Sequence, residues 1–501
     1  MPNEPQEREQ GPSGAHAAGR SWTRPAAAIG LVTGAVLAAA ILGAAILGGP
    51  SPEPVAVVSS ATPAPAAVSS AGSSASPAVV SSAGPTASPV PASAAAPTPL
   101  APTPPATATP ATATPGPSPA ASAPPASASP DASPGSTEVS ASLAARLDAR
   151  LQTLLKRSGI PGVSAAIVWD DGRRWSGAAG SADLATARVM TPETAFALAS
   201  VSKTLTAAVV LQLVSEGRLA LDQPVAPLLS AFRLDPRITV RMLLDHSSGL
   251  PDYFLNPKID RPLQAKPDAA WTALQAWRFA PAKRPVPGTT WRYSNSNYLL
   301  LGELVKAVTG RSLATEVRAR LLDPLGLTTA WFQAAEKPRA VGATGYKRLA
   351  TAGGGFRYAR VAPPSDIMPF RSVVTAAGGA GSIAATAMDA ALWMRAFAGG
   401  DVLPADIQAA MLGDAAATKA LHARIPYGLG IQLVPLDGRR ALGHSGKYLG
   451  FRNVVRYVPE AGVTIAVLTN QGTYDPSKIA AYLLRIVAPK PTAAPTPSPT
   501  R

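Results

Sequence analysis

One long stretch of this sequence lacks the side chains needed for a packed core. From Pro50 to Ser136 nearly every residue is Ala, Pro, Ser, Thr, Val or Gly, and only Glu53 and Asp131 are charged. Such a segment buries too little surface to offset its loss of conformational entropy, so we expect a disordered, partly polyproline linker. A short tail at residues 489–501 has the same character. We therefore predict one compact domain, at residues 137–488.

An uncharged apolar run precedes the linker at residues 26–49. As a helix rising about 1.5 Å per residue, it would extend roughly 36 Å, more than the roughly 30 Å hydrocarbon core of a bilayer. Arginines lie before it, in a polar tail at residues 1–25, and none follows for many residues. This asymmetry predicts a cytoplasmic N-terminus and a single-pass cell-membrane anchor with an extracytoplasmic domain. The alternative is a cleaved signal peptide, whose apolar region usually spans about 7 to 15 residues.

Two scarce residue types limit the chemistry. The chain has no cysteine, which excludes a disulfide scaffold, a thiolate zinc site and a cysteine nucleophile. It has four histidines, none in an HExxH motif, so we expect no metal centre. No sequence feature implies an organic cofactor.

The predicted domain is basic. Of the chain's 45 basic and 30 acidic residues, three and five lie before residue 137, which leaves the rest with a net charge of about +17. This charge is compatible with adhesion to anionic wall polymers or lipid head groups, or with a generally basic surface. No basic cluster interleaved with aromatic residues indicates nucleic-acid binding.

Hydrophobic periodicity predicts an α+β fold. Leucines at helical spacing from Leu143 to Leu155 indicate a helix that ends at Ser158, and the stretch 191–327 is mostly helical in pattern. Strand-like runs occur near both ends of the domain, and a helix at Ser477–Val487 follows the last of them. The runs are VSAAIVW from Val163, RRWSGAAG from Arg173, RALGHS from Arg440, FRNVVRYV from Phe451 and VTIAVLT from Val463. We therefore predict an antiparallel sheet built from both chain ends, flanked by helices, with a helical lobe.

Ser200 and Lys203 stand at the start of an apolar run that ends at Gly217. Residues three apart on a helix share a face, so the hydroxyl and the amine would point the same way. A serine is a weak nucleophile until a base takes its proton, and a desolvated lysine can serve as that base. The helix N-terminus would also stabilise an oxyanion. Taken alone, this SxxK motif is a weak signal, because it can arise by chance and the bland interpretation of Ser200 as an N-cap is favoured.

Two further motifs strengthen the chemical interpretation. Tyr293 and Asn295 form a YxN motif before a second amphipathic helix, and His444 and Gly446 form an HxG motif at the end of a predicted strand. A tyrosine can relay a proton, an asparagine can bond a substrate amide, and a small-residue turn after His444 would let backbone approach the substrate. Singly, they could be a core aromatic, a helix cap and a surface strand residue. Together with SxxK they favour a catalytic site.

The combined motifs resemble the superfamily of serine β-lactamases and penicillin-recognising D-alanyl-D-alanine carboxypeptidases, in its class C or esterase-like branch. The resemblance covers roughly residues 143–487. It depends on ASVSKT from Ala199, LLDHSSGLPDY from Leu243, PGTTWRYSNSNY from Pro287, YGLGI from Tyr427 and GHSGKYLGFRN from Gly443. The family's fold, an antiparallel sheet flanked by helices with a helical lobe, is the one that the periodicity predicts.

The resemblance implies a role for each matching residue. Ser200 would be the acylated nucleophile, Lys203 and Tyr293 would share the general-base and general-acid duties, and Asn295 would bind the substrate amide. Acyl transfer would then proceed through an acyl-enzyme that water hydrolyses.

The third motif implies the remaining substrate contacts. His444 stands where many relatives have lysine, so a positive charge there would depend on pH. Gly446 would line the substrate site, and the backbone N–H groups of Lys447 and Ser200 would form the oxyanion hole. Other serine-hydrolase plans fit less well, because the folded region has no GxSxG or GDSGG segment. His246 is a lesser candidate for a catalytic base, with a place in a loop beside the site as the alternative.

The leading hypothesis is an anchored serine hydrolase that acts on the D-alanyl termini of cell-wall peptides. An esterase or a true β-lactamase on the same scaffold is an alternative, since substrate choice would lie in rim loops such as 353–364. A second alternative is a penicillin-binding sensor that is acylated without turnover. The expected partners are a small-molecule or peptide substrate and, through the N-terminal helix, a membrane, but no nucleic acid.

Overall fold

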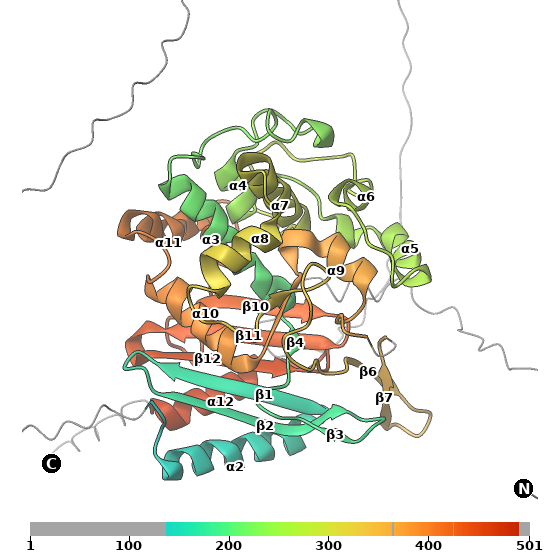
Figure 1. Ribbon diagram of the computed structural model, residues 1–501, viewed down its shortest axis with the longest axis vertical. Coiled ribbons are helices and arrows are strands. Elements are labelled where there is room, and N and C mark those ends of the chain that lie inside the picture. Colours follow the sequence, from blue (N-terminus) through green and yellow to red (C-terminus); the bar gives the residue numbers. More distant parts are fainter. Residues whose placement is uncertain (1–136, 363–364, 424, 490–501) are drawn as a thin grey trace, which may run out of the picture. The chain divides into compact units, whose positions relative to one another are not determined.

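The computed structural model describes residues 137–362, 365–423 and 425–489 (Figure 1). The predicted N-terminal tail, membrane span and linker at residues 1–136 lie outside the described residues, as does the tail from residue 490 onward. Within the described ranges, every helix is too short or too polar to cross a bilayer.

A seven-stranded antiparallel sheet forms the centre of the domain, in the order β3-β2-β1-β12-β11-β10-β9. Its central strands come from opposite chain ends, since Val163 of β1 pairs with Thr469 of β12. The predicted fold class, and the predicted origin of the sheet in both chain ends, are therefore confirmed. The strands are β1 (Gly162–Trp169), β2 (Arg174–Asp183), β3 (Arg188–Val189), β9 (Gln432–Leu433), β10 (Leu442–Tyr448), β11 (Phe451–Val458) and β12 (Val463–Thr469).

Helices cover both faces of this sheet, which explains why β1 is buried along its whole length. Val163 and Ile167 face outward, where they join a core with α2 (Ala141–Ser158) and α12 (Ser477–Val487). Ala166, one position along, faces inward to the larger core, on the side of α10 (Ala387–Gly399). Both predicted flanking helices end where expected, and Gly159 closes α2 in a left-handed conformation, with φ 58°. Figure 1 shows α2 below the strands and the helical lobe above them.

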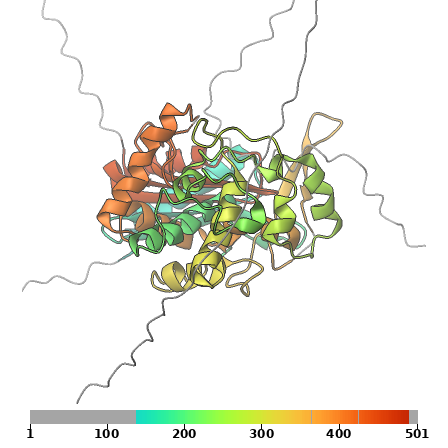
Figure 2. The same cartoon turned by 90° about the horizontal axis from the view of Figure 1, so that it is seen from above.

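The lobe is built from helices, and Figure 2 shows those of residues 202–317 from above, in green and yellow, over the sheet. The segment predicted to be mostly helical contributes most of them. The helices are α3 (Ser202–Ser215), α4 (Val240–Asp245), α5 (Asp260–Ala265), α6 (Ala273–Trp277), α7 (Asn295–Thr309), α8 (Leu313–Val317), α9 (Arg371–Ala377) and α11 (Ala405–Ala420). The short turns are η1 (Ala199–Val201), η2 (Ser230–Phe232), η3 (Tyr253–Leu255), η4 (Pro257–Ile259), the π-type η5 (Arg318–Leu322), η6 (Gly378–Ala380) and η7 (Pro459–Ala461).

Two small strand pairings complete the domain, and sequence periodicity did not predict them. The first is a three-stranded sheet in the order β4-β8-β5, whose strand β4 lies directly before η1 in the chain. The second is the hairpin β6–β7, which forms part of the predicted rim. Their bounds are β4 (Phe196–Ala197), β5 (Trp331–Phe332), β6 (Tyr346–Ala350), β7 (Phe356–Arg360) and β8 (Ile383–Ala385).

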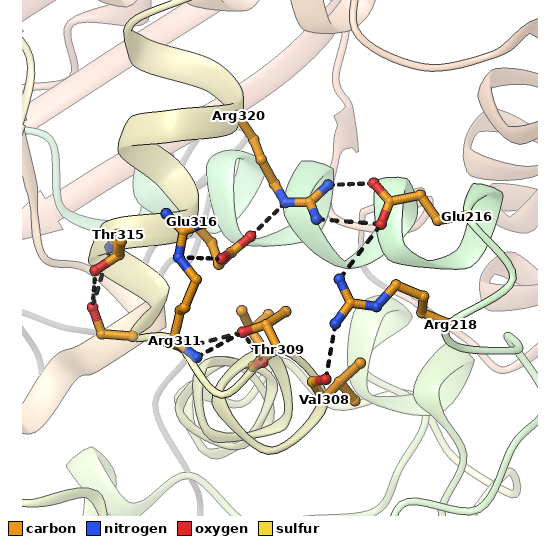
Figure 3. Close-up of polar contacts among 10 residues, drawn as sticks. Glu216, Arg218, Val308, Thr309, Arg311, Thr315, Glu316 and Arg320 are labelled. Atoms are coloured by element: carbon orange, nitrogen blue, oxygen red, sulfur yellow. Dashed lines mark hydrogen bonds and ion pairs between the residues drawn. The ribbon is translucent and has the colours of Figure 1, made fainter. Parts of the chain in front are cut away.

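Ion pairs join the C-terminal ends of α3, α7 and α8 (Figure 3). The Arg320 guanidinium lies between Glu216, directly after α3, and Glu316 of α8, whose Oε2 is 2.5 Å from Arg320 Nε. Arg218 contacts Glu216 and also donates to the carbonyl of Val308 on α7, at 2.9 Å. The network therefore fixes the ends of α3 and α7 relative to each other, and the opposite ends of these helices carry the SxxK and YxN motifs.

Candidate active site

Ser200 lies in a tight turn between β4 and α3. The preceding residue, Ala199, has φ 50°, a left-handed conformation that costs a non-glycine residue energy and is commonest at functional positions. Ser200 is 6% exposed, and its hydroxyl caps neither η1 nor α3, since both helix starts lack a side-chain cap. The N-cap interpretation of Ser200 is therefore wrong. The turn instead presents the hydroxyl to the side chain of Lys203.

Lys203 is completely buried, and its ammonium nitrogen has three oxygen partners. Nζ lies 3.1 Å from Ser200 Oγ, 2.8 Å from Asn295 Oδ1 and 2.8 Å from the carbonyl oxygen of Ala380. No carboxylate of the described chain is within ion-pair distance of it. Burial lowers the pKa of Lys203 from 10.5 to about 7, while the more distant charge of Asp252 acts to raise it. A large fraction of the amine is therefore free base at neutral pH.

Tyr293 lies beside Lys203, with Nζ 5.1 Å from its ring centroid. Its hydroxyl is buried and has no partner with ordinary hydrogen-bond geometry in the described part of the chain. Burial raises the pKa of Tyr293 well above 10, and the nearby Ser200 hydroxyl offsets this only in part. The phenol is therefore neutral, and its unpartnered hydroxyl can exchange a proton with an incoming group.

Asn295 begins α7, and both ends of its carboxamide bond the protein. Oδ1 accepts from Lys203 Nζ, and Nδ2 donates to Asp252 Oδ2 at 2.8 Å. The side chain is 1% exposed. The predicted contact of Asn295 with a substrate amide stays a prediction, and its observed contacts orient the lysine.

His444 faces the same buried region from β10. Its Nδ1 lies 2.7 Å from the carbonyl oxygen of Ser445, which can only accept, so Nδ1 carries the hydrogen. Nε2 then accepts from the hydroxyl of Tyr427 at 3.0 Å. Burial and the charge of Lys203 lower the pKa of His444 well below 6.5. The ring is therefore neutral and fully enclosed, which excludes the surface-residue interpretation and places any titration of His444 below neutral pH.

Gly446 lies opposite the nucleophile turn. The predicted turn after His444 is wrong, because β10 continues unbroken through Gly446 to Tyr448. Glycine is required for another reason: a Cβ at this position would lie 2.2 Å from the carbonyl oxygen of Leu198. The strand can therefore pack directly on the turn that carries Ser200.

Lys447 presents its backbone at the edge of β10. The N–H of Ser445 donates to Gln432 Oε1, toward β9, and backbone N–H groups alternate along a strand, so the N–H of Lys447 points to the same edge. β9 pairs only with Leu442 and Gly443 and does not reach this position. This geometry is compatible with the predicted oxyanion hole.

Comparison with known proteins agrees with this geometry. The beta-lactamase family model matches residues 147–488. The chain belongs to the beta-lactamase family. It is 30% identical to penicillin-binding protein 4 of Amycolatopsis lactamdurans over 340 residues, which cover 64% of this chain and 84% of that protein. It is also 29% identical to a D-aminopeptidase of Brucella anthropi, over 69% of this chain, and 35% identical to esterase EstB of Burkholderia gladioli, over 40% of this chain. The chain spans only 63% and 54% of the lengths of these last two relatives.

Solved structures of two amide hydrolases share the fold of this beta-lactamase family domain. A D-stereospecific amidohydrolase from Streptomyces sp. matches with a TM-score of 0.58 and 25% identity, over 69% of this chain and 99% of that one. The D-amino acid amidase of Ochrobactrum anthropi SV3 has the same TM-score at 22% identity and supports the fold alone. The relatives of the chain are thus serine-acyl hydrolases.

His246 supports the YxN segment of this beta-lactamase family site. Its Nδ1 accepts from the N–H of Ser294 at 3.2 Å and contacts Asn297 Nδ2 at 3.1 Å, and its ring centroid is 4.4 Å from that of Tyr293. Burial and the nearby Lys203 lower the pKa of His246 well below 6.5. These contacts show that the ring packs against Tyr293 and the start of α7. They favour a supporting role for His246 in a loop beside the site over the role of a catalytic base.

Three contributors to the site were not identified from the sequence: Asp252, Tyr427 and the carbonyl of Ala380. The first two lie within the segments LLDHSSGLPDY and YGLGI, on which the family resemblance depends, so a signal for them existed. A backbone carbonyl leaves no signal in sequence. Within the described ranges, no group of three or more His, Asp or Glu side chains is arranged to hold a metal ion.

Proposed function

We propose that this chain is a serine hydrolase that forms an acyl-enzyme at Ser200 and acts on D-alanyl-D-alanine termini of cell-wall peptides. The observation that carries the proposal is the 3.1 Å contact between Ser200 Oγ and the buried amine of Lys203, whose pKa is about 7. An amine of this kind can accept a proton from a hydroxyl at neutral pH.

In the proposed acylation step, the free amine of Lys203 takes the hydroxyl proton as Ser200 Oγ attacks the substrate carbonyl carbon. The oxyanion is stabilised by the N–H groups of Ser200 and Lys447. Tyr293 donates its proton to the leaving nitrogen or oxygen as the carbonyl–leaving group bond breaks, and is reprotonated from Lys203. Water then attacks the ester at Ser200, loses its proton to the same pair, and releases the acid and the free hydroxyl.

The state of His444 favours a second candidate, an amidase or esterase whose substrate has no carboxylate beside the scissile bond. A neutral imidazole with both nitrogens bonded to the protein supplies no cation for a substrate carboxylate at neutral pH. The relatives named D-aminopeptidase, D-stereospecific amidohydrolase and esterase support this candidate.

A substrate panel tests these candidates. The full chain is incubated with a fluorescent penicillin, a peptide ending in D-Ala-D-Ala, D-alanine amide and a p-nitrophenyl ester, beside the Ser200→Ala variant. Release of D-alanine from the peptide supports the carboxypeptidase, turnover of the amide or ester alone supports the second candidate, and a stable penicillin label without turnover supports the sensor. Activity that survives in Ser200→Ala contradicts the acyl-enzyme itself.

The proposed location is the outer side of the cell membrane, with the apolar run at residues 26–49 as the anchor and the linker as a spacer. Fractionation of cells that express the full chain, beside a variant lacking residues 26–49, tests this. We expect the full chain in the membrane fraction, its domain accessible to added protease on spheroplasts, and the shortened chain in the soluble fraction. A full chain that stays soluble and uncleaved contradicts the anchor, and a soluble chain shortened near residue 49 indicates a signal peptide.

A further inference from the structure

Asp252 ends a buried chain of hydrogen bonds that starts at the nucleophile. Lys203 Nζ donates to Ser200 Oγ and to Asn295 Oδ1, and Asn295 Nδ2 donates to Asp252 Oδ2 at 2.8 Å. The other carboxylate oxygen, Oδ1, accepts from the N–H of Phe254 at 2.9 Å and so caps η3. Asp252 is 3% exposed. Every link of this chain is therefore shielded from water.

The carboxylate decides which way the Asn295 carboxamide faces. A carboxamide has one accepting end and one donating end, and both oxygens of Asp252 accept, Oδ1 from the N–H of Phe254 and Oδ2 from Asn295 Nδ2. Burial raises the pKa of Asp252, while these two donors and the charge of Lys203 act to lower it. Nδ2 must therefore face Asp252, which leaves Oδ1 for Lys203. A rotated carboxamide would set Nδ2 against Nζ, two donors facing each other, and Lys203 would keep only the Ser200 hydroxyl and the Ala380 carbonyl.

We propose that Asp252 is a positioning residue of the active site, which locks the Asn295 carboxamide with Oδ1 toward Lys203 and thereby holds the amine against Ser200. The proposal rests on the proposed function, because it concerns the same acylation step. Asp252 has no hydrogen bond to Ser200 or to Tyr293, so its effect passes through Asn295 and through its charge.

The charge of Asp252 acts on an amine with few other charged neighbours. The titratable groups that face Lys203 are Asp252 before η3, His246 at the end of α4, Tyr293 before α7, Tyr298 on α7 and His444 on β10. The two imidazoles and the two phenols are neutral at neutral pH, because burial lowers the pKa values of the former and raises those of the latter. Loss of the Asp252 charge therefore lowers the pKa of Lys203 further.

The test is the variant Asp252→Asn, which keeps the Oδ1 cap on η3 but sets an amide nitrogen against Asn295 Nδ2. We expect kcat with the best substrate of the panel to fall roughly 10- to 100-fold, with a smaller change in KM, as for the loss of an orienting partner. We also expect the ascending limb of kcat/KM against pH to move to lower pH. A defect in folding alone would lower the active fraction and leave the limb in place.

Asp389→Asn is the matched control. Asp389, in the first turn of α10, is also a buried carboxylate and is 6% exposed. It accepts a hydrogen bond from the N–H of Thr329. It lies outside the hydrogen-bond chain of the active site, so we expect its pH profile to match wild type.

A double-mutant cycle separates the carboxamide effect from other causes. In an Asn295→Ala background, Asp252→Asn should reduce kcat by a much smaller factor than in the wild type. An equal factor in both backgrounds, or an unshifted limb in the single variant, overturns the proposal. If Ser200→Ala is inactive and the pH profile of Asp252→Asn is unaltered, this proposal is overturned and the proposed function stays intact. If Ser200→Ala is active, the proposed function itself is overturned.

If Asp252→Asn does not fold, Asn295→Asp gives an independent test. This variant places a carboxyl directly beside Nζ and opposite Asp252, where the two acids share one proton. We expect the ascending limb to move to higher pH, because negative charge next to Nζ favours the protonated amine. An unmoved limb in this folded variant contradicts the proposed coupling.

Discussion

The two ends of the α3–α7 helix pair handle positive charge in opposite ways. At the C-terminal end, Arg320 and Arg218 are partly exposed and paired with glutamates. At the N-terminal end, Lys203 is fully buried and bonded only to neutral oxygens, with the Asp252 carboxylate one side chain farther away. The same two helices therefore carry ion pairs that join them at one end. At the other end they carry an amine that can lose or gain a proton near neutral pH.

Burial and the type of partner together determine whether a basic side chain stays charged. Carboxylate partners raise the pKa of Arg320 and keep it charged, whereas desolvation brings the pKa of Lys203 to about 7. An ion pair at Lys203 would have stabilised its charged form and removed its capacity as a base. In the proposed mechanism, Lys203 stays available as a base because no carboxylate of the described residues lies within ion-pair distance of it.

Lys203→Arg should cause the largest loss of activity. A guanidinium stays protonated at any working pH and is larger than the site, so we expect acylation of Ser200 to fall at least about 1,000-fold. The measurement is the rate of p-nitrophenol release, or of fluorescent penicillin labelling. Lys306→Arg, on an exposed position of α7, is the control and should be unaffected. Substantial activity in Lys203→Arg would show that a different group removes the proton.

Tyr293→Phe should lower kcat roughly 100-fold, in the range of general acid–base contributions, without loss of stability. Among the described residues, the hydroxyl it removes has no partner with ordinary hydrogen-bond geometry, so thermal unfolding should occur at an unchanged or higher temperature. Tyr346→Phe should have the opposite effect on stability, because its hydroxyl accepts from the N–H of Leu184 at 2.7 Å. That control should unfold at a lower temperature than wild type. A Tyr293→Phe enzyme as active as wild type would exclude the relay.

The dependence of kcat/KM on pH tests the lowered pKa of Lys203 without a mutation. Lys203 acts as a base only when unprotonated, and its pKa is about 7, so kcat/KM should rise through pH 7. Below that value the loss approaches about tenfold per pH unit. The profile is measured with an ester between pH 5 and 8, at constant ionic strength. An ascending limb near the ordinary pKa of lysine would mean that burial does not tune this amine.

Arg320→Met should have the smallest effect on catalysis. It leaves the 3% exposed Glu316 with Arg311 as its remaining arginine partner, so the free energy of unfolding should fall by about 1 to 3 kcal/mol, with kcat/KM unchanged. Chemical denaturation measures the loss. Arg237→Met, which removes an exposed local pair with Asp235, is the control and should leave the melting temperature unchanged. A strong fall in activity in Arg320→Met would show that the ion pairs position the buried end.

Sequence predicted best what local periodicity or a short motif encodes. The repeat of Leu147, Leu151 and Leu154 marks the buried face of α2, and the three-residue spacing of Ser200 and Lys203 brings their side chains together. The hairpin β1–β2 and the last three strands were recognisable for the same reason, because each is a continuous run of strand-like residues.

Sequence failed where the cause lies in a distant segment. Gly446 signalled a turn, but its reason is the carbonyl of Leu198, which only the folded chain brings near. A titrating charge was expected at His444, but Tyr427 encloses the ring and burial keeps it neutral. The link from Asn295 to Asp252 likewise joins two segments whose distance no local pattern encodes.

The pairing of β1 with β12 sets the order in which the domain can be completed. Val163 finds its partner Thr469 only after nearly the whole domain has been synthesised. Contacts between such distant residues slow folding, and until then β1 exposes an apolar edge that invites aggregation. A nascent chain should thus stay without its native sheet until its last strand emerges, and variants truncated before residue 463 should be insoluble rather than partly folded.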